Sequence, residues 1–197
     1  MMKRINAAVA ANPADDQPVV ASSAYVDPSA RVIGKVEIGS RVLVGPHAVI
    51  RADEMDASGN VAPIVIGSDS NVQDGVIVHS LAGQRVSVGT RVSLSHGCIV
   101  HGPCTIGDRC FIGFRAIVFK SSVGAGTYVG TGAIVEGVEL LPDTLVPAGS
   151  VVNSAEAVSR LSKTGAKEQD FMNDVVEMNM KLAEGYLRPR KAVKQAT

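Results

Sequence analysis

The sequence predicts an all-β protein, a parallel β-helix followed by an α-helix near its C-terminal end. The main observation is an aliphatic residue at every sixth position, often with a glycine directly after it. This hexapeptide period is typical of a coil in which three short strands make one turn and each strand points one apolar side chain inward. The second observation is a change of spacing to threes and fours near the C-terminus, which indicates a helix. The clearest repeat runs through Ile66, Val72, Val78, Val88, Leu94, Val100, Ile106, Ile112 and Val118.

The 197-residue chain divides into four expected parts. Residues 1–22 have no period and are expected to form a flexible lead-in. Residues 23–152 are expected to form the β-helix domain. Residues 153–188 are expected to be a helical segment that packs on the β-helix or across a subunit boundary, and residues 189–197 a basic tail. The helical spacing is carried by Phe171, Val175, Met178, Leu182 and Tyr186.

Two steps of the repeat exceed six residues, which predicts a loop between Ile50 and Ile66 and a smaller one between Val78 and Val88. We expect these loops to bulge out of the coil without breaking its phase. Every third inward residue then lies on the same face, so the repeat assigns each residue to a face and to a turn.

Three of the four histidines take up related places in this frame. His79 and His101 follow inward residues of one face in successive turns, and Arg51 precedes them on that face. Stacked strands lie about 4.8 Å apart, so the two imidazoles could meet one ion at Zn–N distances of about 2.0–2.1 Å. His96 lies on the adjoining face, around a corner of the coil from this pair and stacked on Asp74. From that position, a single chain can hardly direct all three imidazole rings at one point. We therefore expect a metal at a subunit interface, and the three-sided coil favours a trimer.

The remaining histidine and the cysteines have simpler interpretations. His47 falls in a corner of the coil and is expected at the surface. Cys98, Cys104 and Cys110 are six residues apart and share one phase of the repeat, so successive thiols fall on different faces and do not pair. We expect buried thiols that fill corners.

Charge and hydropathy exclude several function classes. Nineteen Lys and Arg balance nineteen Asp and Glu, so no electrostatic argument favours nucleic acid or an anionic membrane as a partner. No apolar run approaches the roughly 18 residues that a membrane span needs. The first residues carry only a short, weakly apolar run, so we expect a cytoplasmic protein rather than a secreted one.

Several segments resemble the metal-site motifs of the γ-class carbonic anhydrases. They are IRADE (50–54), NVQDGVIVHS (71–80) and SLSHGCIVHGP (93–103), and FIGFRAIVFKSSVG (111–124), VPAGSVV (146–152) and LAEGY (182–186) add to the match. The resemblance covers residues 26–187. It implies a left-handed β-helix of hexapeptide repeats and a homotrimer with Zn2+, or alternatively Fe2+ or Co2+, at each subunit interface.

The resemblance implies that His79 and His101 of one chain and His96 of its neighbour are the metal ligands. Three neutral imidazoles leave one position of the metal open, so bound water can ionise near pH 7, as is known for carbonic anhydrases. The hydroxide then attacks CO2, bicarbonate leaves, and a new water must lose its proton.

Six further residues receive roles from the same resemblance. Gln73 would orient the metal-bound hydroxide or bicarbonate, Asn179 would lie near the substrate pocket, and Glu54 would pass protons. The residues expected to organise the ligands and the interface are Arg51 and Asp53, as an ion pair, and Asp74, which would hold a ligand or its neighbour in place.

One segment departs from the pattern of the best-known active members, which carry an acidic loop with a proton-shuttling glutamate. Here the residues from Ser80 onward read SLAGQRVSVG, without a carboxylate. This departure indicates the shorter-loop branch of the family. Proton export would then fall to Glu54, to buffer or to another route, and turnover could be slow.

Three functions remain open at this point. The first is a metal-dependent carbonic anhydrase that reversibly hydrates CO2 to bicarbonate with a metal-bound hydroxide at trimer interfaces. The second is a catalytically weak or inactive relative that acts as a structural or scaffold trimer, which the missing loop favours. The third is a hexapeptide acyltransferase, which shares the coil but uses one catalytic histidine and binds CoA or an acyl carrier. Bound metal separates the third function from the others, and turnover separates the first from the second.

Overall fold

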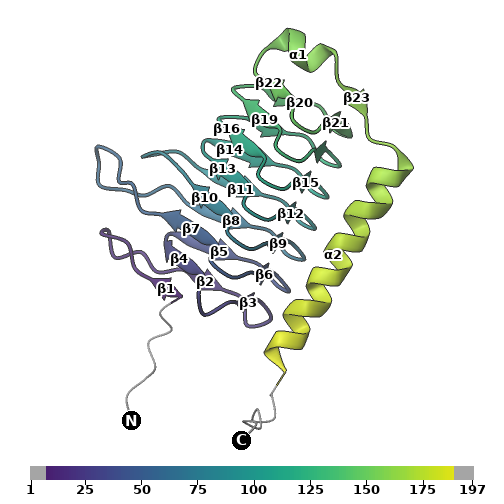
Figure 1. The fold of residues 1–197 in the computed structure, drawn as a ribbon. Helices are drawn as coiled ribbons and strands as arrows, with labels where there is room; N and C mark the ends of the chain where they lie inside the picture. The colour runs from purple at the N-terminus through teal and green to yellow at the C-terminus, as the bar shows by residue number, and fades with distance from the viewer. Residues whose placement is uncertain (1–7, 189–197) are drawn as a thin grey trace, which may run out of the picture.

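The computed structural model describes residues 8–188 and confirms the parallel β-helix. The described strands form three sheets, which we call A, B and C, of eight, seven and eight strands. Neighbours within a sheet are three strands apart along most of the chain, so each turn of the coil adds one strand to every sheet (Figure 1). All the pairings between the described strands are parallel except the last one in sheet C, and an isolated antiparallel bridge joins Met55 and Val61 in the loop after β7 (Val49–Ala52).

The strands are short, and most have two or three residues. Sheet A consists of β1 (Val9–Ala10), β4 (Arg31–Gly34), β7 (Val49–Ala52), β10 (Ile77–His79), β13 (Ile99–His101), β16 (Ile117–Phe119), β19 (Ile134–Glu136) and β22 (Val151–Val152). Sheet B consists of β2 (Val19–Val20), β5 (Val36–Ile38), β8 (Ile64–Ile66), β11 (Val86–Val88), β14 (Cys104–Ile106), β17 (Ser122–Val123) and β20 (Glu139–Leu140). Sheet C consists of β3 (Tyr25–Val26), β6 (Leu43–Val44), β9 (Asn71–Val72), β12 (Ser93–Leu94), β15 (Phe111–Ile112), β18 (Tyr128–Val129), β21 (Thr144–Val146) and β23 (Ser162–Lys163).

The core is a column of inward aliphatic side chains inside the coil. The residues that set the six-residue period, such as Val78, Val100 and Val118, are fully buried. Burying one such side chain contributes about 1.5–3 kcal/mol, and the β-branched shape of valine and isoleucine suits a pleated strand. The backbone groups pair with the turns above and below, so the strand register is continuous along the coil.

The recurring glycines follow from the close approach of successive turns at the corners. A Cβ on Gly67 would lie 2.4 Å from the backbone oxygen of Gly89, a distance that real side chains do not adopt. A similar clash would occur at Gly107, 2.6 Å from the backbone nitrogen of Ala125. Only glycine therefore fits at these positions.

The β-helix begins earlier than the sequence analysis expects. β1 pairs with β4 and β2 pairs with β5, so residues 9–20 already belong to the coil and are not a flexible lead-in. Val20 lies six residues before Val26 and is in phase with the repeat, whereas Val9 lies eleven residues before Val20, so this longer step hides the first strand in the sequence. Residues 1–7 of the expected lead-in and the expected basic tail at 189–197 lie outside the described residues.

Two helices follow the coil, α1 (Ala155–Ser159) and α2 (Ala166–Leu187). α2 lies along sheet C, where it contacts β3, β6, β9 and β12 (Figure 1). Its buried side chains are Met172, Val176 and Ala183. The apolar stripe identified from the sequence is only part buried: Phe171 and Tyr186 contact the rings of Phe111 and Tyr25 in sheet C, with centroids 5.2 and 4.6 Å apart. Phe171 remains 43% exposed and Met178 57%. No helix within residues 8–188 has the length and apolar content to cross a membrane.

Candidate metal centre

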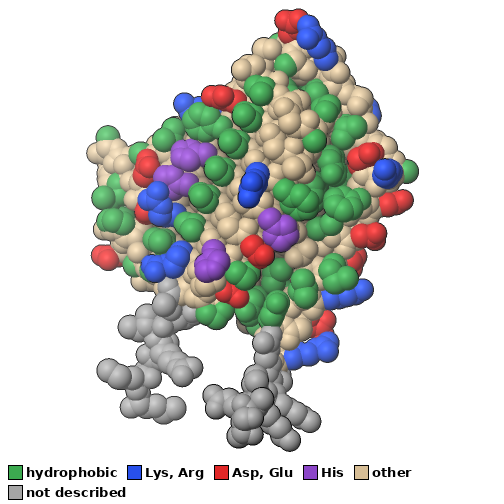
Figure 2. All heavy atoms as spheres, in the orientation of Figure 1, with side chains coloured by type: hydrophobic (Ala, Val, Ile, Leu, Met, Phe, Trp, Pro, Cys, Tyr) green, Lys and Arg blue, Asp and Glu red, His purple; other side chains and the backbone are tan. Residues whose placement is uncertain are grey.

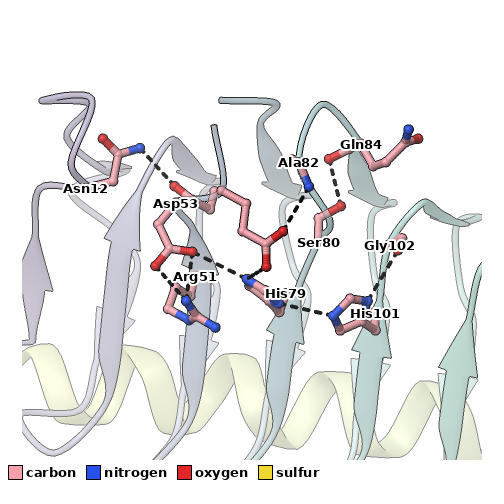
Figure 3. A network of polar contacts seen from close by, with 11 residues as sticks. Asn12, Arg51, Asp53, His79, Ser80, Ala82, Gln84, His101 and Gly102 are labelled. Carbon is pink, nitrogen blue, oxygen red and sulfur yellow. Dashed lines mark hydrogen bonds and ion pairs between the residues drawn. The ribbon is translucent and has the colours of Figure 1, made fainter. Parts of the chain in front are cut away.

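The structure confirms that both loops bulge out without breaking the phase of the repeat. In sheet A, His79 pairs in register with Arg51 on one side and with His101 on the other. The two imidazoles therefore stand on adjacent rungs and face each other, with Nδ1 of His79 3.1 Å from Nε2 of His101 (Figure 3).

This spacing fits two ligands of one ion. Two nitrogens bound to a tetrahedral zinc at 2.0–2.1 Å lie about 3.3 Å apart, close to the 3.1 Å that separates the facing nitrogens. The two histidines can therefore occupy two of the four positions around such an ion.

The contacts on the far side of each imidazole ring indicate which of its nitrogens is free to bind a metal. Nε2 of His79 lies 3.3 Å from Oδ1 of Asp53, and Nδ1 of His101 lies 3.3 Å from the carbonyl oxygen of Gly102. Both partners only accept, so each ring, when neutral, would carry its proton on this nitrogen. The facing nitrogens then both carry lone pairs, an arrangement that a shared cation would stabilise.

The carboxylates beside His79 are themselves held in place. Arg51 donates to both oxygens of Asp53, the shorter contact being 2.7 Å, so the expected ion pair forms within one chain. Oε1 of Glu54 lies 3.6 Å from Nε2 of His79. The other oxygen of Glu54 accepts a hydrogen bond from the backbone N–H of Ala82, which ties the short loop after β10 to the carboxylate.

These surroundings favour a neutral His79. Burial lowers the pKa of His79 below its ordinary value, and the positive charge of Arg51 lowers it further. The hydrogen bond to Asp53 and the charge of Glu54 act in the opposite direction and offset part of the effect. A neutral imidazole is the form that binds a metal.

The third expected ligand is separated from this pair. His96 lies in the corner that leads from sheet C to sheet A, its side chain is 54% exposed, and its Nδ1 is 3.5 Å from Oδ2 of the stacked Asp74. Within residues 8–188 of one chain, no three His, Cys, Asp or Glu side chains are placed to hold one ion. Figure 2 accordingly shows two adjacent histidines and further histidines apart from them.

His96 belongs to a second cluster, in a groove between sheet C and α2. The groove has a volume of about 510 Å3, and Gln73 and Asn179, both expected near the substrate, line it. Asn179 donates to the carbonyl oxygen of Val175 within its own helix. The apolar wall of the groove consists of Phe111, Phe114, Phe171, Val175 and Met178.

Two polar residues beside this cluster, Asn71 and Ser93, were not predicted from the sequence. Gln73 donates through Nε2 to Oδ1 of Asn71, and Asn71 donates through Nδ2 to Oγ of Ser93, each at 2.9 Å. This chain orients the Gln73 amide. The sequence signal for them is that Asn71 and Ser93 are polar and occupy the same outward position on successive turns of sheet C.

The simpler interpretations of the other residues are confirmed. His47 is exposed, and the three cysteines are free and buried. Burial raises the pKa of Cys98 and of Cys110 to about 12, so neither thiol is a ready nucleophile or ligand.

No protein-family model matches the chain. The carbonic anhydrase of Methanosarcina thermophila is 38% identical over 89% of this chain and 77% of its own length. The carboxysome assembly protein CcmM of Nostoc sp. is 38% identical over 84% of this chain, which spans only 30% of that protein. A solved structure of a hexapeptide transferase family protein from Anaplasma phagocytophilum matches with a TM-score of 0.74 and 24% identity over 93% of this chain and all of that one, and this likeness shows the fold alone.

Proposed function

Since the chain belongs to the γ-class carbonic anhydrase family of hexapeptide-repeat proteins, we propose that it is a metal-dependent carbonic anhydrase. Its active sites lie between the subunits of a homotrimer and interconvert CO2 and bicarbonate. The observation that carries the proposal is the pair of facing imidazole nitrogens of His79 and His101, 3.1 Å apart, with their other nitrogens engaged. His79 and His101 lie in one cluster, and His96 lies elsewhere on the same chain. The site would therefore be completed only by His96 of a second copy.

The outer face of sheet A supports the trimer. One of the two outward positions on its strands forms a continuous aliphatic column, in register from turn to turn, made of Val49, Ile77, Ile99, Ile117, Ile134 and Val151. Ile77 is 41% exposed in the single chain. Figure 2 shows hydrophobic side chains gathered on the face that also bears the histidines. An apolar face of this extent favours burial against another copy.

The other two faces are less suited to that contact. The outward positions of sheet B are mainly polar, for example Glu37, Ser87 and Thr105, and α2 covers part of sheet C. In a closed ring of three copies with sheet A toward the axis, the edge of sheet A that bears His79 and His101 meets the corner of the next copy that bears His96.

In that ring, His79 and His101 of one copy and His96 of the next would hold the metal, with zinc first and Fe2+ or Co2+ as alternatives. When bound, such a metal would act as a Lewis acid that makes a water nucleophilic near neutral pH. The carboxylate of Asp53 keeps the ligand nitrogen of His79 free of a proton, and Asp74 restrains His96. Gln73 positions the reacting oxygen, and the aromatic wall of the groove excludes water from CO2.

Proton export falls to Glu54, which lies beside His79 and is part exposed. The loop that follows His79 carries no carboxylate, which supports the shorter-loop branch and slow turnover. The same observation, together with the likeness to a carboxysome assembly protein, favours a second candidate function, a structural trimer with weak or no catalysis. Metal content with and without CO2 hydration separates the two.

Mixed trimers test the shared site directly. His79→Ala and His96→Ala trimers should each lose the metal and CO2 hydration, because every site lacks one ligand. Co-expressing the two variants should restore metal and activity at about a quarter of the interfaces, where an intact His79 meets an intact His96. His47→Ala is the matched control and should behave as the wild type. Recovery of neither metal nor activity in the mixture would overturn the shared site.

A further inference from the structure

The corner of the coil between sheets B and C carries a column of six residues with left-handed backbone. Their φ angles lie between 53° and 70°, a conformation that residues other than glycine adopt rarely. From the second member on, each backbone N–H donates to a carbonyl of the preceding turn, so the members stand about 4.8 Å apart. This corner column consists of Arg41, Asp69, Arg91, Arg109, Gly126 and Asp143.

The three arginines of the corner column differ in their partners. Arg41 donates through two nitrogens to the two carboxylate oxygens of Asp69, at 2.6 and 2.8 Å. Arg91 donates at 2.9 Å to Glu177 of α2. The side chain of Arg109 has neither a hydrogen bond nor an ion pair with any residue among 8–188. All five N–H donors of its guanidinium are therefore available to a ligand.

A cavity of about 220 Å3 lies at Arg109, between the corner column and α2. It is found where Gly126 takes the place of a larger residue in the column and leaves the room of a side chain empty. Gln169 and Asn173 line the cavity from α2, and neither side-chain amide has a hydrogen-bond partner within the described residues. Several unused donors thus surround one small space.

The two ends of this cavity differ in charge. Arg91 and Arg109 lie on one side of Gly126, and Asp143 lies on the other. The carboxylate of Asp143 lies over Gly126, since its Oδ1 would clash with a Cβ at that position. Arg109 and Asp143 are two turns apart, about 9.6 Å along the column, and they form no ion pair. The cavity therefore has a cationic end and an end that accepts hydrogen bonds.

We propose that this cavity binds a small phosphate monoester that carries a free hydroxyl group. The phosphate oxygens accept from Arg109 and from the remaining donors of Arg91, with the amides of Gln169 and Asn173 as further donors. The hydroxyl of the alcohol part donates to Asp143. Guanidinium groups match phosphate oxygens in pairs, and three terminal oxygens can use more than one such group.

Size and charge narrow the ligand class. Pockets for drug-sized ligands have about 300–1,000 Å3, so 220 Å3 leaves room for a phosphate and a few further atoms. Inorganic sulfate has no hydroxyl to offer Asp143 and meets the negative charge of that carboxylate. The cavity shares no lining residue with the groove beside His96. The inference is therefore independent of the metal and of CO2 hydration.

Arg109→Gln tests the cationic end of the cavity. Glycerol 3-phosphate is the probe, and its affinity is measured by calorimetry on the full-length, chelator-stripped protein, so that a bound metal cannot hold the phosphate. The affinity should fall at least about tenfold, because charge-assisted hydrogen bonds are lost.

Arg41→Gln is the matched control for this variant. Arg41 is likewise exposed and has the same backbone conformation in the same column, but Asp69 occupies its guanidinium and it lines no part of the cavity. Its affinity for the probe should stay within about twofold of the wild type. No saturable binding up to about 10 mM probe, or an equal loss of affinity in both arginine variants, would overturn the site.

Asp143→Asn tests the accepting end. Sulfate should bind this variant more tightly than the wild type, because the charge that opposes the dianion is gone. The preference of the wild type for glycerol 3-phosphate over sulfate should shrink in the variant. A wild type that binds sulfate as tightly as glycerol 3-phosphate would refute the phosphate monoester as the ligand class.

Discussion

The ionisation of His79 determines at which pH the candidate site can accept a metal. Its pKa lies below the ordinary value of 6.5, first because the ring is buried and second because Arg51 is close. As the pH falls below about 6.5, the unfolded chain therefore takes up a proton on this histidine before the folded chain does. The contribution of His79 to stability is complete above that pH and is lost as the pH falls toward the pKa of the folded state.

Arg51→Gln should raise the pKa of His79. The substitution removes a positive charge and frees Asp53 to act on the ring alone, and both effects favour the protonated form. Metal release on acidification should then begin at a higher pH. Histidine NMR titration of the metal-free protein measures the shift. Arg41→Gln, which removes a different ion pair, to Asp69, is the control. Equal titration of His79 in the wild type and in Arg51→Gln would contradict the role given to Arg51.

At the scale of elements, corner glycines and inward aliphatics define each turn of the coil. The inward residues supply the apolar burial, and the glycines allow successive turns to stack at the spacing of a sheet. These two requirements are separate, so a substitution at a corner glycine can destabilise a turn even when the inward residues are unchanged.

Gly67→Ala should destabilise the coil by about 1–3 kcal/mol, because the new Cβ would clash with the backbone of Gly89. Gly185→Ala, in α2 with open space around it, should instead stabilise the protein by about 0.5–1 kcal/mol. Urea unfolding of both variants measures the difference. If Gly67→Ala is as stable as the wild type, the turns do not approach as closely as described.

α2 shows how one helix can carry two apolar surfaces. Its fully buried side chains are Met172, Val176 and Ala183. The more regular stripe that includes Phe171 and Met178 stays part exposed and borders the groove, and Phe171 also contacts the ring of Phe111 in sheet C. The helical period is therefore a good predictor of the helix itself. It does not decide which stripe meets the coil, because the facing surface is made of residues distant in sequence.

At the scale of the whole molecule, the three faces of the prism differ in chemistry. Sheet A presents an aliphatic column flanked by the histidine pair, sheet B presents mainly polar residues, and sheet C carries α2. This division leaves one apolar face free for association with other copies.

Ile99→Asp should dissociate the proposed trimer. A carboxylate in the centre of the aliphatic column would be buried against two other copies without a partner. The mass from light scattering should fall to that of one chain, and metal should be lost with it. Thr105→Asp, at an outward position of sheet B, should leave the assembly intact. A trimeric Ile99→Asp protein would show that sheet A is not the contact face.

The sequence by itself determined the coil, its phase through two loops, and the set of histidines that stack on adjacent rungs. These features depend on local spacing, because every sixth residue repeats the same environment. The tertiary structure decided the start of the coil at β1, the buried stripe of α2, the partners Asp53 and Gly102 that select the free imidazole nitrogens, and the cavity beside Arg109. Each of these depends on backbone pairing or on side-chain contacts that bring different turns together, and the six-residue period does not encode which atoms meet.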